Sequence, residues 1–291
     1  MKKIIYDCDN TMGIRHRDVD DALTILYLLG RKDVELLGIT TTFGNDTLDA
    51  VFEATCNLVD KIHHKDIPVV KGGGPRNRKN RAAAFLASTA AENAGEITLI
   101  ATGALTNLYG ARLIDDTFWK NIRDVVVMGG VTEPLLIAGE KMDELNFSCD
   151  PEATYDVLRA TPPKTVITGN LCLSAFFGET EFSRLKRRLQ VPVFKLIYEG
   201  ISPWRDFIYE VFKLRGFYNW DVVAGIYATQ PELFENRAEW IESTPLELKK
   251  GFLKKGTPHQ NAYALNIPRA IKNIDAFNDT VFEAWENVSL K

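Results

Sequence analysis

Five aspartates lie close together near the start of the chain: Asp7, Asp9, Asp18, Asp20 and Asp21. A short apolar run at 4–6 precedes them, and a second apolar run at 22–29 follows them. Like charges at this density repel one another, and a hard cation with oxygen ligands, such as Ca²⁺ or Mg²⁺, relieves the repulsion. The residue types therefore predict a metal site.

Asp20 and Asp21 could instead have a purely structural role at the start of a helix. Asp20 and Asp21 stand where a helix begins, and acids at a helix N-terminus commonly cap it and complement its dipole. Asp7 and Asp9 have no such role because they follow a predicted strand. A first strand that leads into a helix is typical of α/β enzymes, which hold ligands outside the carboxyl ends of their strands. We therefore favour the metal interpretation for the group.

The composition is that of an ordinary globular protein. The chain has 291 residues, of which 45% are hydrophobic and 25% charged, and its formal net charge is −4. With no internal repeat or linker, the expectation is a single domain over residues 1–291. The basic cluster at 184–188 has helical spacing and indicates the solvated face of an amphipathic helix. We therefore expect no nucleic-acid or membrane partner.

The cysteines and the N-terminus indicate a cytoplasmic protein. Cys8, Cys56, Cys149 and Cys172 lack CxxC spacing, so neither a zinc site nor a disulfide framework is expected. The apolar residues after Met1 are too few for a signal-peptide core. No run approaches the ~20 apolar residues of a membrane span.

Strand and helix patterns alternate along most of the chain. After the first strand, strands are predicted at 34–42, 67–70, 96–101, 124–127 and 164–168. After the first helix, helices are predicted at 46–61, 81–93, 105–113, from 150, 181–215 with breaks at Pro192 and Pro203, 219–230 and 268–285. Segment 131–143 is expected to be irregular, and the glycine-rich segment 72–75, which lacks P-loop spacing, a plain loop.

The predicted fold class is α/β. Strands that alternate with helices imply an open, mainly parallel sheet covered by helices on both faces. Alternating apolar residues at 240–248 and 262–267 predict added antiparallel strands near the C-terminus.

Several short motifs together resemble those of the inosine-uridine-preferring nucleoside hydrolase family. They are Asp7-Cys8-Asp9, Asp20-Asp21-Ala22, Thr40 to Asn45, Ala101 to Asn107, Met128-Gly129-Gly130, Glu144-Leu145-Asn146 and Asp150 to Ala153. Their order and spacing, and not any one of them, carry the signal, which runs from the first strand to about Phe234. The resemblance implies a calcium-dependent N-ribohydrolase with a nucleoside substrate, usually a homodimer or homotetramer.

The resemblance also implies roles for individual residues. It implies a Ca²⁺ ion held by Asp9, Asp21, the carbonyl of Thr102 and Asp221, with Asp9 also taking a proton from the attacking water. The positions implied to hold the ribose hydroxyls are Asp20, Asn45, Glu144 and Asn146. Cleavage of an N-glycosidic bond passes through an oxocarbenium-like sugar, which nearby carboxylates stabilise.

The sequence departs from the family pattern in three places. Residues 10–19 replace a tight loop and bring in Arg15, His16 and Arg17, which we expect beside the ribose site, where they leave a modified riboside open as substrate. The family's long segment after the third strand, with its His-Gly loop over the base, is missing after Gly74. The histidine that usually precedes the last acidic ligand is Trp220 here.

Trp220 bears on specificity. A tryptophan at this position resembles the purine-specific branch of the family, in which an indole stacks on the base. This interpretation predicts a preference for purine ribonucleosides and a place in purine salvage. The alternative is a core aromatic residue beside a helix start.

Two other functions fit parts of the sequence. Residues 4–11 also match the strand and DxDxT signature of haloacid-dehalogenase-type phosphatases, with Asp7 as nucleophile and Asp9 as acid and base. That family needs a distal acidic pair for Mg²⁺, whereas here the pair follows at once and Asp221 stands alone. A non-catalytic nucleoside- or ribose-binding protein is the third possibility. Asp9 favours an enzyme because a binding protein needs no base.

Overall fold

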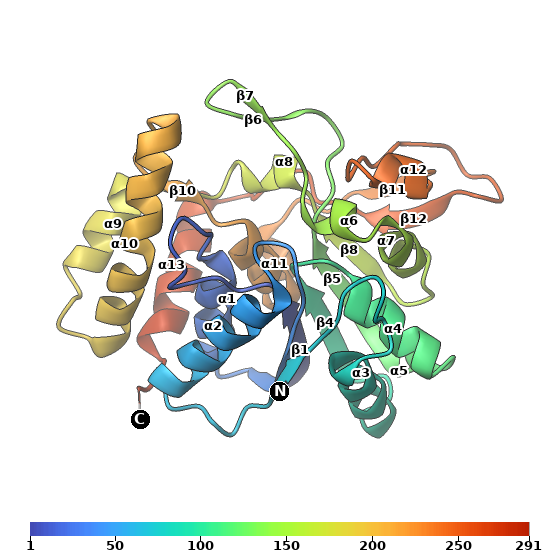
Figure 1. Ribbon diagram of the computed structural model, residues 1–291. Helices are drawn as coiled ribbons and strands as arrows, with labels where there is room; N and C mark the ends of the chain where they lie inside the picture. The colour runs from blue at the N-terminus through green and yellow to red at the C-terminus, as the bar shows by residue number, and fades with distance from the viewer. Residues whose placement is uncertain (291) are drawn as a thin grey trace.

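An eight-stranded sheet forms the centre of the protein in the computed structural model, which describes residues 1–290 (Figure 1). Its strands are β1 (Lys2–Cys8), β2 (Val34–Thr41), β3 (Val69–Lys71), β4 (Ile97–Ala101), β5 (Ile122–Met128), β8 (Lys164–Ile167), β11 (Ala238–Ile241) and β12 (Tyr263–Asn266). Their order is β11-β12-β8-β5-β4-β1-β2-β3. Every neighbouring pair is parallel except β11 with β12. The predicted mainly parallel α/β sheet is confirmed.

Helices cover both faces of the sheet (Figure 1). One face carries α1 (Asp20–Gly30), α2 (Leu48–Lys61), α9 (Glu179–Lys186), α10 (Pro192–Phe212), α11 (Trp220–Thr229) and α13 (Ile274–Glu286). The other face carries α3 (Arg81–Glu92), α4 (Thr106–Ile114), α5 (Phe118–Asn121), α7 (Pro151–Leu158) and α12 (Pro245–Leu248). Short elements complete the fold: α6 (Asn146–Cys149), α8 (Gly169–Cys172), a 3-10 turn at Pro231–Leu233, and the pair β9 (Phe176–Phe177) and β10 (Phe217–Tyr218). Within residues 1–290, no helix is long and apolar enough to traverse a bilayer.

The central strands alternate between two cores. In β1, Ile4 and Tyr6 join the core under α1 and α11, whereas Ile5 joins the core under α3 and α4. Successive strand residues point to opposite faces, so a strand covered on both faces is apolar throughout. The unbroken apolar start of the chain follows from this burial.

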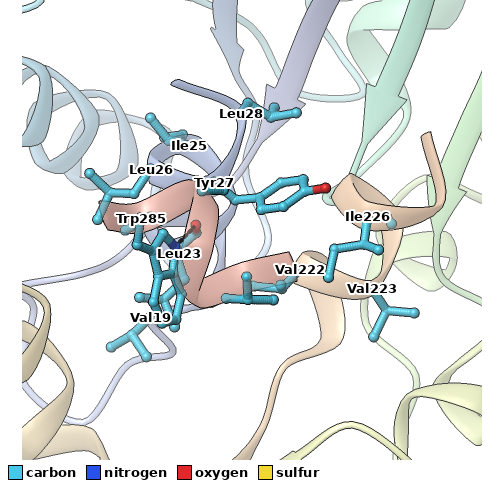
Figure 2. Packing of buried hydrophobic residues seen from close by; sticks show 14 of the residues in the cluster. Val19, Leu23, Ile25, Leu26, Tyr27, Leu28, Val222, Val223, Ile226 and Trp285 are labelled. Atoms are coloured by element: carbon cyan, nitrogen blue, oxygen red, sulfur yellow. Dashed lines mark hydrogen bonds between the residues drawn. The ribbon is translucent and has the colours of Figure 1, made fainter. Parts of the chain in front are cut away.

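Helix α1 packs between α11 and α13 (Figure 2). The indole Nε1 of Trp285 on α13 donates a hydrogen bond to the carbonyl of Leu23 at 3.0 Å. A Cβ on Gly30 would lie 1.7 Å from the carbonyl oxygen of Ala284, so the two helices touch where only glycine fits. This contact fixes the position of α1, and with it that of the acids at its N-terminus.

Two predicted segments differ from the structure near the ends of the sheet. Segment 131–143 is not irregular but holds the antiparallel hairpin of β6 (Leu135–Ile137) and β7 (Glu140–Met142). The strand predicted at 240–248 ends at Ile241, because Thr244 and Glu247 form a capping box that starts α12. The strand within 262–267 pairs in parallel with β8, so β11 alone is antiparallel in the sheet.

The predicted break at Pro192 is confirmed, but the one at Pro203 is wrong. Pro192 is the first residue of α10, a position where a missing N–H costs nothing. Pro203 lies inside the same helix, which continues to Phe212. Buried Ile201 and Ile208 pack α10 against the core on either side of Pro203, and this packing outweighs the local propensity.

Candidate active site

The acids converge where the strand order reverses. From β1 the chain passes to β2 on one side and later places β4 on the other, and open α/β sheets bind ligands at such a point. Asp7 near the end of β1 lies in register with Thr40 of β2 and Ala101 of β4. Thr102 follows β4 and donates its backbone N–H to the Asp7 carbonyl at 2.9 Å.

Asp7 has a structural position. Its side chain is fully buried, and its Oδ1 accepts hydrogen bonds from Thr40 Oγ1 and from Asn107 Nδ2, the latter at 2.8 Å. Burial raises the pKa of Asp7 to about 7. A carboxyl group enclosed in this way joins β1, β2 and α4 and cannot reach a substrate as a nucleophile. The phosphatase interpretation is therefore not favoured.

Asp9 is held rigidly by the chain around it. Its Oδ2 accepts the backbone N–H of Asn45 at 2.7 Å, and its Oδ1 accepts the Asn45 side-chain amide at 3.3 Å. A Cβ on Gly44 would lie 2.2 Å from Asp9 Oδ2, and one on Gly103 would lie 3.1 Å from Asp9 Cγ. Any side chain at position 44 or 103 would thus collide with the Asp9 carboxylate, so the carboxylate fits only beside glycine at both positions.

Asp21 has one satisfied and one free oxygen. Its Oδ1 accepts hydrogen bonds from Tyr6 at 2.7 Å and from Thr102 Oγ1 at 2.7 Å. Burial, followed by the charge of Asp21, raises the pKa of Tyr6 well above its usual range, so the phenol remains a donor. Asp21 Oδ2 is buried and has no hydrogen-bond partner within the described chain. A buried carboxylate oxygen without a donor is a position that a cation would satisfy.

Asp20 and Asp221 join α1 to α11. The backbone N–H of Asp221 donates to Asp20 Oδ2 at 2.8 Å. The N-cap residue of α1 is Val19, and no side chain accepts a hydrogen bond there. Asp20 and Asp21 therefore do not cap α1, because their oxygens bond to Asp221, Tyr6 and Thr102. Both lie in its first turn, where their charges complement the helix dipole.

The carboxyl groups contact one another in pairs. Asp9 lies against Asp21, Asp21 against Asp221, and Asp18 against Asp20. Burial is the largest cause, and the neighbouring negative charges add to it, in raising the pKa values of Asp9, Asp20 and Asp221 well above the usual range. These groups cannot all be ionised together without a compensating positive charge.

The donor set fits a hard cation. Within residues 1–290, no group of three or more His, Cys, Asp and Glu side chains is arranged so that it could hold a metal ion as it stands. The carboxylates of Asp9, in the loop after β1, of Asp21, on α1, and of Asp221, on α11, nevertheless lie together, and Asp21 Oδ2 has no partner. Oxygen donors of this kind suit Ca²⁺ or Mg²⁺, and they do not suit softer metals.

A pocket opens beside the carboxylates. It is lined by Asp18, Asp20, Asn45, Thr102, Met128, Gly130, Val131, Leu135, Ile137, Met142, Asp143, Glu144, Leu145, Asn146, Gly169, Trp220 and Asp221. Every residue predicted from the family resemblance lines it except Asp9 and Asp21, which lie against the lining acids. The structure thus brings the predicted set together, although their roles stay predictions.

Two of the predicted ribose residues are also held by the backbone. Asn146 donates its amide to the carbonyl of Thr102 at 2.9 Å and to that of Met128 at 3.0 Å. Glu144 accepts the backbone N–H groups of Gly130, Phe147 and Ser148 between 2.8 and 3.0 Å. Both side chains are therefore fixed in place before a ligand arrives.

The apolar wall of the pocket was missed by sequence reasoning. Leu135, Ile137 and Met142 come from the β6–β7 hairpin and line the pocket. Ala138 and Gly139 at its tip both have positive φ, as a two-residue hairpin turn requires. The signal was the apolar run at 135–137 followed by a small residue and glycine.

The inserted loop does not place its cations beside the ribose site. Arg17 pairs with Asp46 at 2.9 Å, His16 stacks on Phe207 at 4.4 Å between ring centres, and Arg15 bonds to His16 at 3.2 Å. None of these three lines the pocket, and of this loop only Asp18 does. The expected cationic surroundings of the ribose site are therefore wrong, because the loop turns toward α10.

Trp220 lies in the pocket wall at the start of α11. Its half-buried ring packs on Tyr218, with 5.2 Å between ring centres. Trp220 thus packs against the hydrophobic core and also lines the pocket. This position is compatible with contact to a base.

Comparison with known proteins identifies relatives over nearly the whole chain. The model of the inosine-uridine preferring nucleoside hydrolases matches residues 4–272. Uridine nucleosidase 1 of Arabidopsis thaliana is 28% identical over 80% of this chain and 75% of its own, and a probable uridine nucleosidase 1 of rice is 26% identical over 80% and 78%. The purine-preferring ribonucleoside hydrolase of Gardnerella vaginalis shares the fold with a TM-score of 0.81 at 19% identity, covering 99% of both chains.

The carboxylate cluster makes a prediction about pH. In chelator-treated protein the folded state holds protons on acids such as Asp18, whose pKa burial raises from 3.8 to about 7, whereas the unfolded chain releases them. The free energy of unfolding should therefore fall as pH rises from about 5 to about 7, by roughly 1.4 kcal/mol per pH unit for each proton involved. Urea unfolding at several pH values measures this slope.

The variant Asp21→Asn provides the comparison, because it removes one charge while keeping an oxygen for Tyr6 and Thr102. Its slope should be shallower than that of the parent, and the exposed control Asp116→Asn should leave the slope unchanged. Stability that rises through this window, or an equal slope in Asp21→Asn, would show that the carboxylates do not repel as described.

Proposed function

Because this chain belongs to the inosine-uridine preferring nucleoside hydrolase family, we propose that it is a calcium-dependent ribonucleoside hydrolase with a preference for purine nucleosides. Family membership makes it an N-ribohydrolase, and it disfavours both the phosphatase and the non-catalytic binding protein. The calcium dependence and the preference are our proposals. The observation that carries them is the pocket in which buried carboxylates meet Trp220.

The cation would be held by Asp9, Asp21, the Thr102 carbonyl and Asp221. The unpartnered Asp21 Oδ2 and the closeness of the Asp9 and Asp221 carboxyl groups to Asp21 support this choice. When bound, Ca²⁺ would orient the ribose hydroxyls and position water. The Thr102 carbonyl already accepts one hydrogen bond from Asn146, and its second lone pair stays available.

The residues of the chain account for the other steps. Asp9, fixed by Asn45 and its glycine neighbours, takes a proton from the water that attacks C1′. Asp20, Asn45, Glu144 and Asn146 hold the ribose hydroxyls. Bonds to the backbone keep Asp20, Glu144 and Asn146 in place, and the bond to Asp9 keeps the Asn45 amide in place. The surrounding carboxylates stabilise the positive charge that develops on the sugar.

Trp220 and the apolar hairpin wall support the purine preference. A two-ring base covers more of an indole than a single ring does, and stacking is worth about 1–3 kcal/mol per base. The curated relatives carry names that specify uridine, whereas a structural neighbour is named purine-preferring. We also propose, on the same family basis, a homodimer or homotetramer that works in the cytoplasm in purine salvage.

The first prediction concerns Asp9. Asp9→Asn should keep the fold and lower turnover roughly 10²–10⁴-fold, since an amide keeps an oxygen but accepts no proton. Release of reducing sugar from inosine measures turnover, with Asp116→Asn as an exposed control that should retain it. Near-normal turnover in folded Asp9→Asn would remove Asp9 from the role of base.

The second prediction concerns substrates. Inosine should be cleaved with a higher kcat/KM than uridine, and 2′-deoxyinosine roughly 10⁴-fold less efficiently than inosine, because the site is built around the ribose hydroxyls. Measuring the three nucleosides with one preparation checks both points. Faster cleavage of uridine would refute the stacking role of Trp220, and equal rates on the deoxy compound would refute hydroxyl recognition.

A further inference from the structure

A second pocket lies between the inserted loop, α2 and α10. It is a groove of about 380 Å³, a volume in the range of small-molecule sites. Among residues 1–290, none lines both this groove and the candidate active-site pocket. The inserted loop builds one wall of the groove with Met12, Gly13, Ile14, Arg15, Arg17 and Val19.

Two contacts dock the inserted loop on α10. A Cβ on Gly200 would lie 2.8 Å from the sulfur of Met12, so glycine leaves room for this side chain. The ring of His16 stacks on Phe207, with 4.4 Å between ring centres. His16 itself has a φ of 60°, a left-handed conformation that non-glycine residues rarely adopt. The docked loop therefore has a defined shape, in which Arg15 lines the groove.

The groove carries positive charge that the protein does not neutralise. Arg15 and Lys61 both line it, both are exposed, and neither forms an ion pair within residues 1–290. Arg15 donates its Nε to His16 at 3.2 Å, which leaves its two terminal nitrogens without a partner in that part of the chain. Glu199, the acid in the lining, lies 3.9 Å from Lys195. A groove with this field attracts an anion.

Apolar side chains line the groove beside these charges, among them Met12, Leu58 and Trp204. Trp204 stacks on Phe207 with 5.5 Å between ring centres, and Phe207 in turn stacks on His16. The indole thus ends a row of three stacked rings and lines the groove. Indoles stack on planar rings such as nucleobases, and methionine sulfur contacts such rings favourably.

We propose that this groove is a second ligand site, for a planar ring that carries a phosphate group, of the nucleoside 5′-monophosphate type. Arg15 binds the phosphate through its two terminal nitrogens, a geometry that suits phosphate oxygens. Lys61 adds to the positive field, and Trp204 packs on the ring. The site is separate from the carboxylates and does not depend on the chemistry proposed for them.

The inserted loop also joins the groove to the active-site pocket. Arg17 and Val19 line the groove, whereas Asp18 between them lines the active-site pocket. The Asp18 carbonyl accepts a hydrogen bond from Thr11 Oγ1 at 2.8 Å, and its Oδ1 accepts the N–H of Val19 at 2.7 Å. A ligand in the groove favours the docked loop, in which Asp18 is held beside Asp20. On the proposed function, this ligand therefore raises the affinity for the nucleoside.

Calorimetric titration with adenosine 5′-monophosphate (AMP), with Ca²⁺ present, tests the site itself. The parent protein should bind AMP, and inorganic phosphate alone should bind at least about tenfold more weakly because it lacks the ring. Arg15→Gln should raise the Kd for AMP about tenfold, the cost of losing a charged hydrogen-bonding partner. Arg76→Gln, which removes an exposed arginine from another loop outside the groove, should leave the Kd unchanged.

Several results would overturn the site. They are absence of AMP binding, or an equal Kd in Arg15→Gln, which would place AMP elsewhere on the protein. Equal affinity for inorganic phosphate would refute recognition of the ring. Lys61→Gln provides a second variant, on a different element, and should also weaken AMP binding. Circular dichroism and thermal melting of each variant exclude loss of fold as the cause of a change.

Kinetics with inosine test the link between the two pockets. Saturating AMP should lower the KM for inosine about fivefold, the lower end of typical allosteric coupling, and should have no such effect on Arg15→Gln. Release of hypoxanthine measures the rate. An unchanged KM would refute the coupling, and a raised KM would show that AMP competes in the active-site pocket. Failure to cleave inosine at all would overturn the proposed function, while the AMP titration would still decide on the groove.

Discussion

The carboxylates buried together at the end of β1 repel one another, and the rest of the structure has to hold them in place against this repulsion. Asp9, Asp20, Asp21 and Asp221 come from a loop and two helices, and each is almost fully buried. Such a group costs folding energy unless protons or a cation neutralise it. Hydrogen bonds from the rest of the molecule offset part of this cost and hold the acids in place. Tyr6 and Thr102 donate to Asp21 Oδ1, and Asn45 donates to Asp9.

The packing of α1 against α11 and α13 determines where the buried acids lie. Helix α1 carries Asp20 and Asp21, and it lies between α11, which carries Asp221, and α13 at the far end of the sequence (Figure 2). Gly30 against Ala284 and Trp285 against Leu23 set the distance between α1 and α13. Residues 200 positions apart therefore form one site, and the last helix contributes to it without touching it.

Much of this could be predicted from the sequence, and for identifiable reasons. The buried strands are short apolar runs, so the α/β sheet and the place of Asp7 and Asp9 at its edge followed from periodicity. The hydrogen bond between Asp20 and Asp221 did not, since nothing local links residues 201 positions apart. The family resemblance placed both residues in one site but predicted no contact between them. The hairpin at 135–142 carried a local signal in its apolar run and the small residue and glycine that follow. The capping box at Thr244 carried one that the alternation of apolar residues at 240–248 obscured.

The inserted loop shows where sequence reasoning fails. Arg15, His16 and Arg17 were expected to change the ribose site because they stand next to its residues in the chain. In the folded protein Arg17 pairs with Asp46, His16 stacks on Phe207 and Arg15 bonds to His16, so only Asp18 of this loop lines the pocket. Side-chain direction in a loop depends on tertiary partners that spacing does not encode.

Calorimetric titration of chelator-treated protein with Ca²⁺ tests the central claim most directly. If the buried carboxylates form a cation site, one Ca²⁺ should bind per chain and, at about 100 times its Kd, stabilise the fold by about 2.7 kcal/mol. Asp221→Asn should weaken this binding, because it removes one of the three carboxylates. Absence of Ca²⁺ binding, or equal binding by Asp221→Asn, would contradict the account.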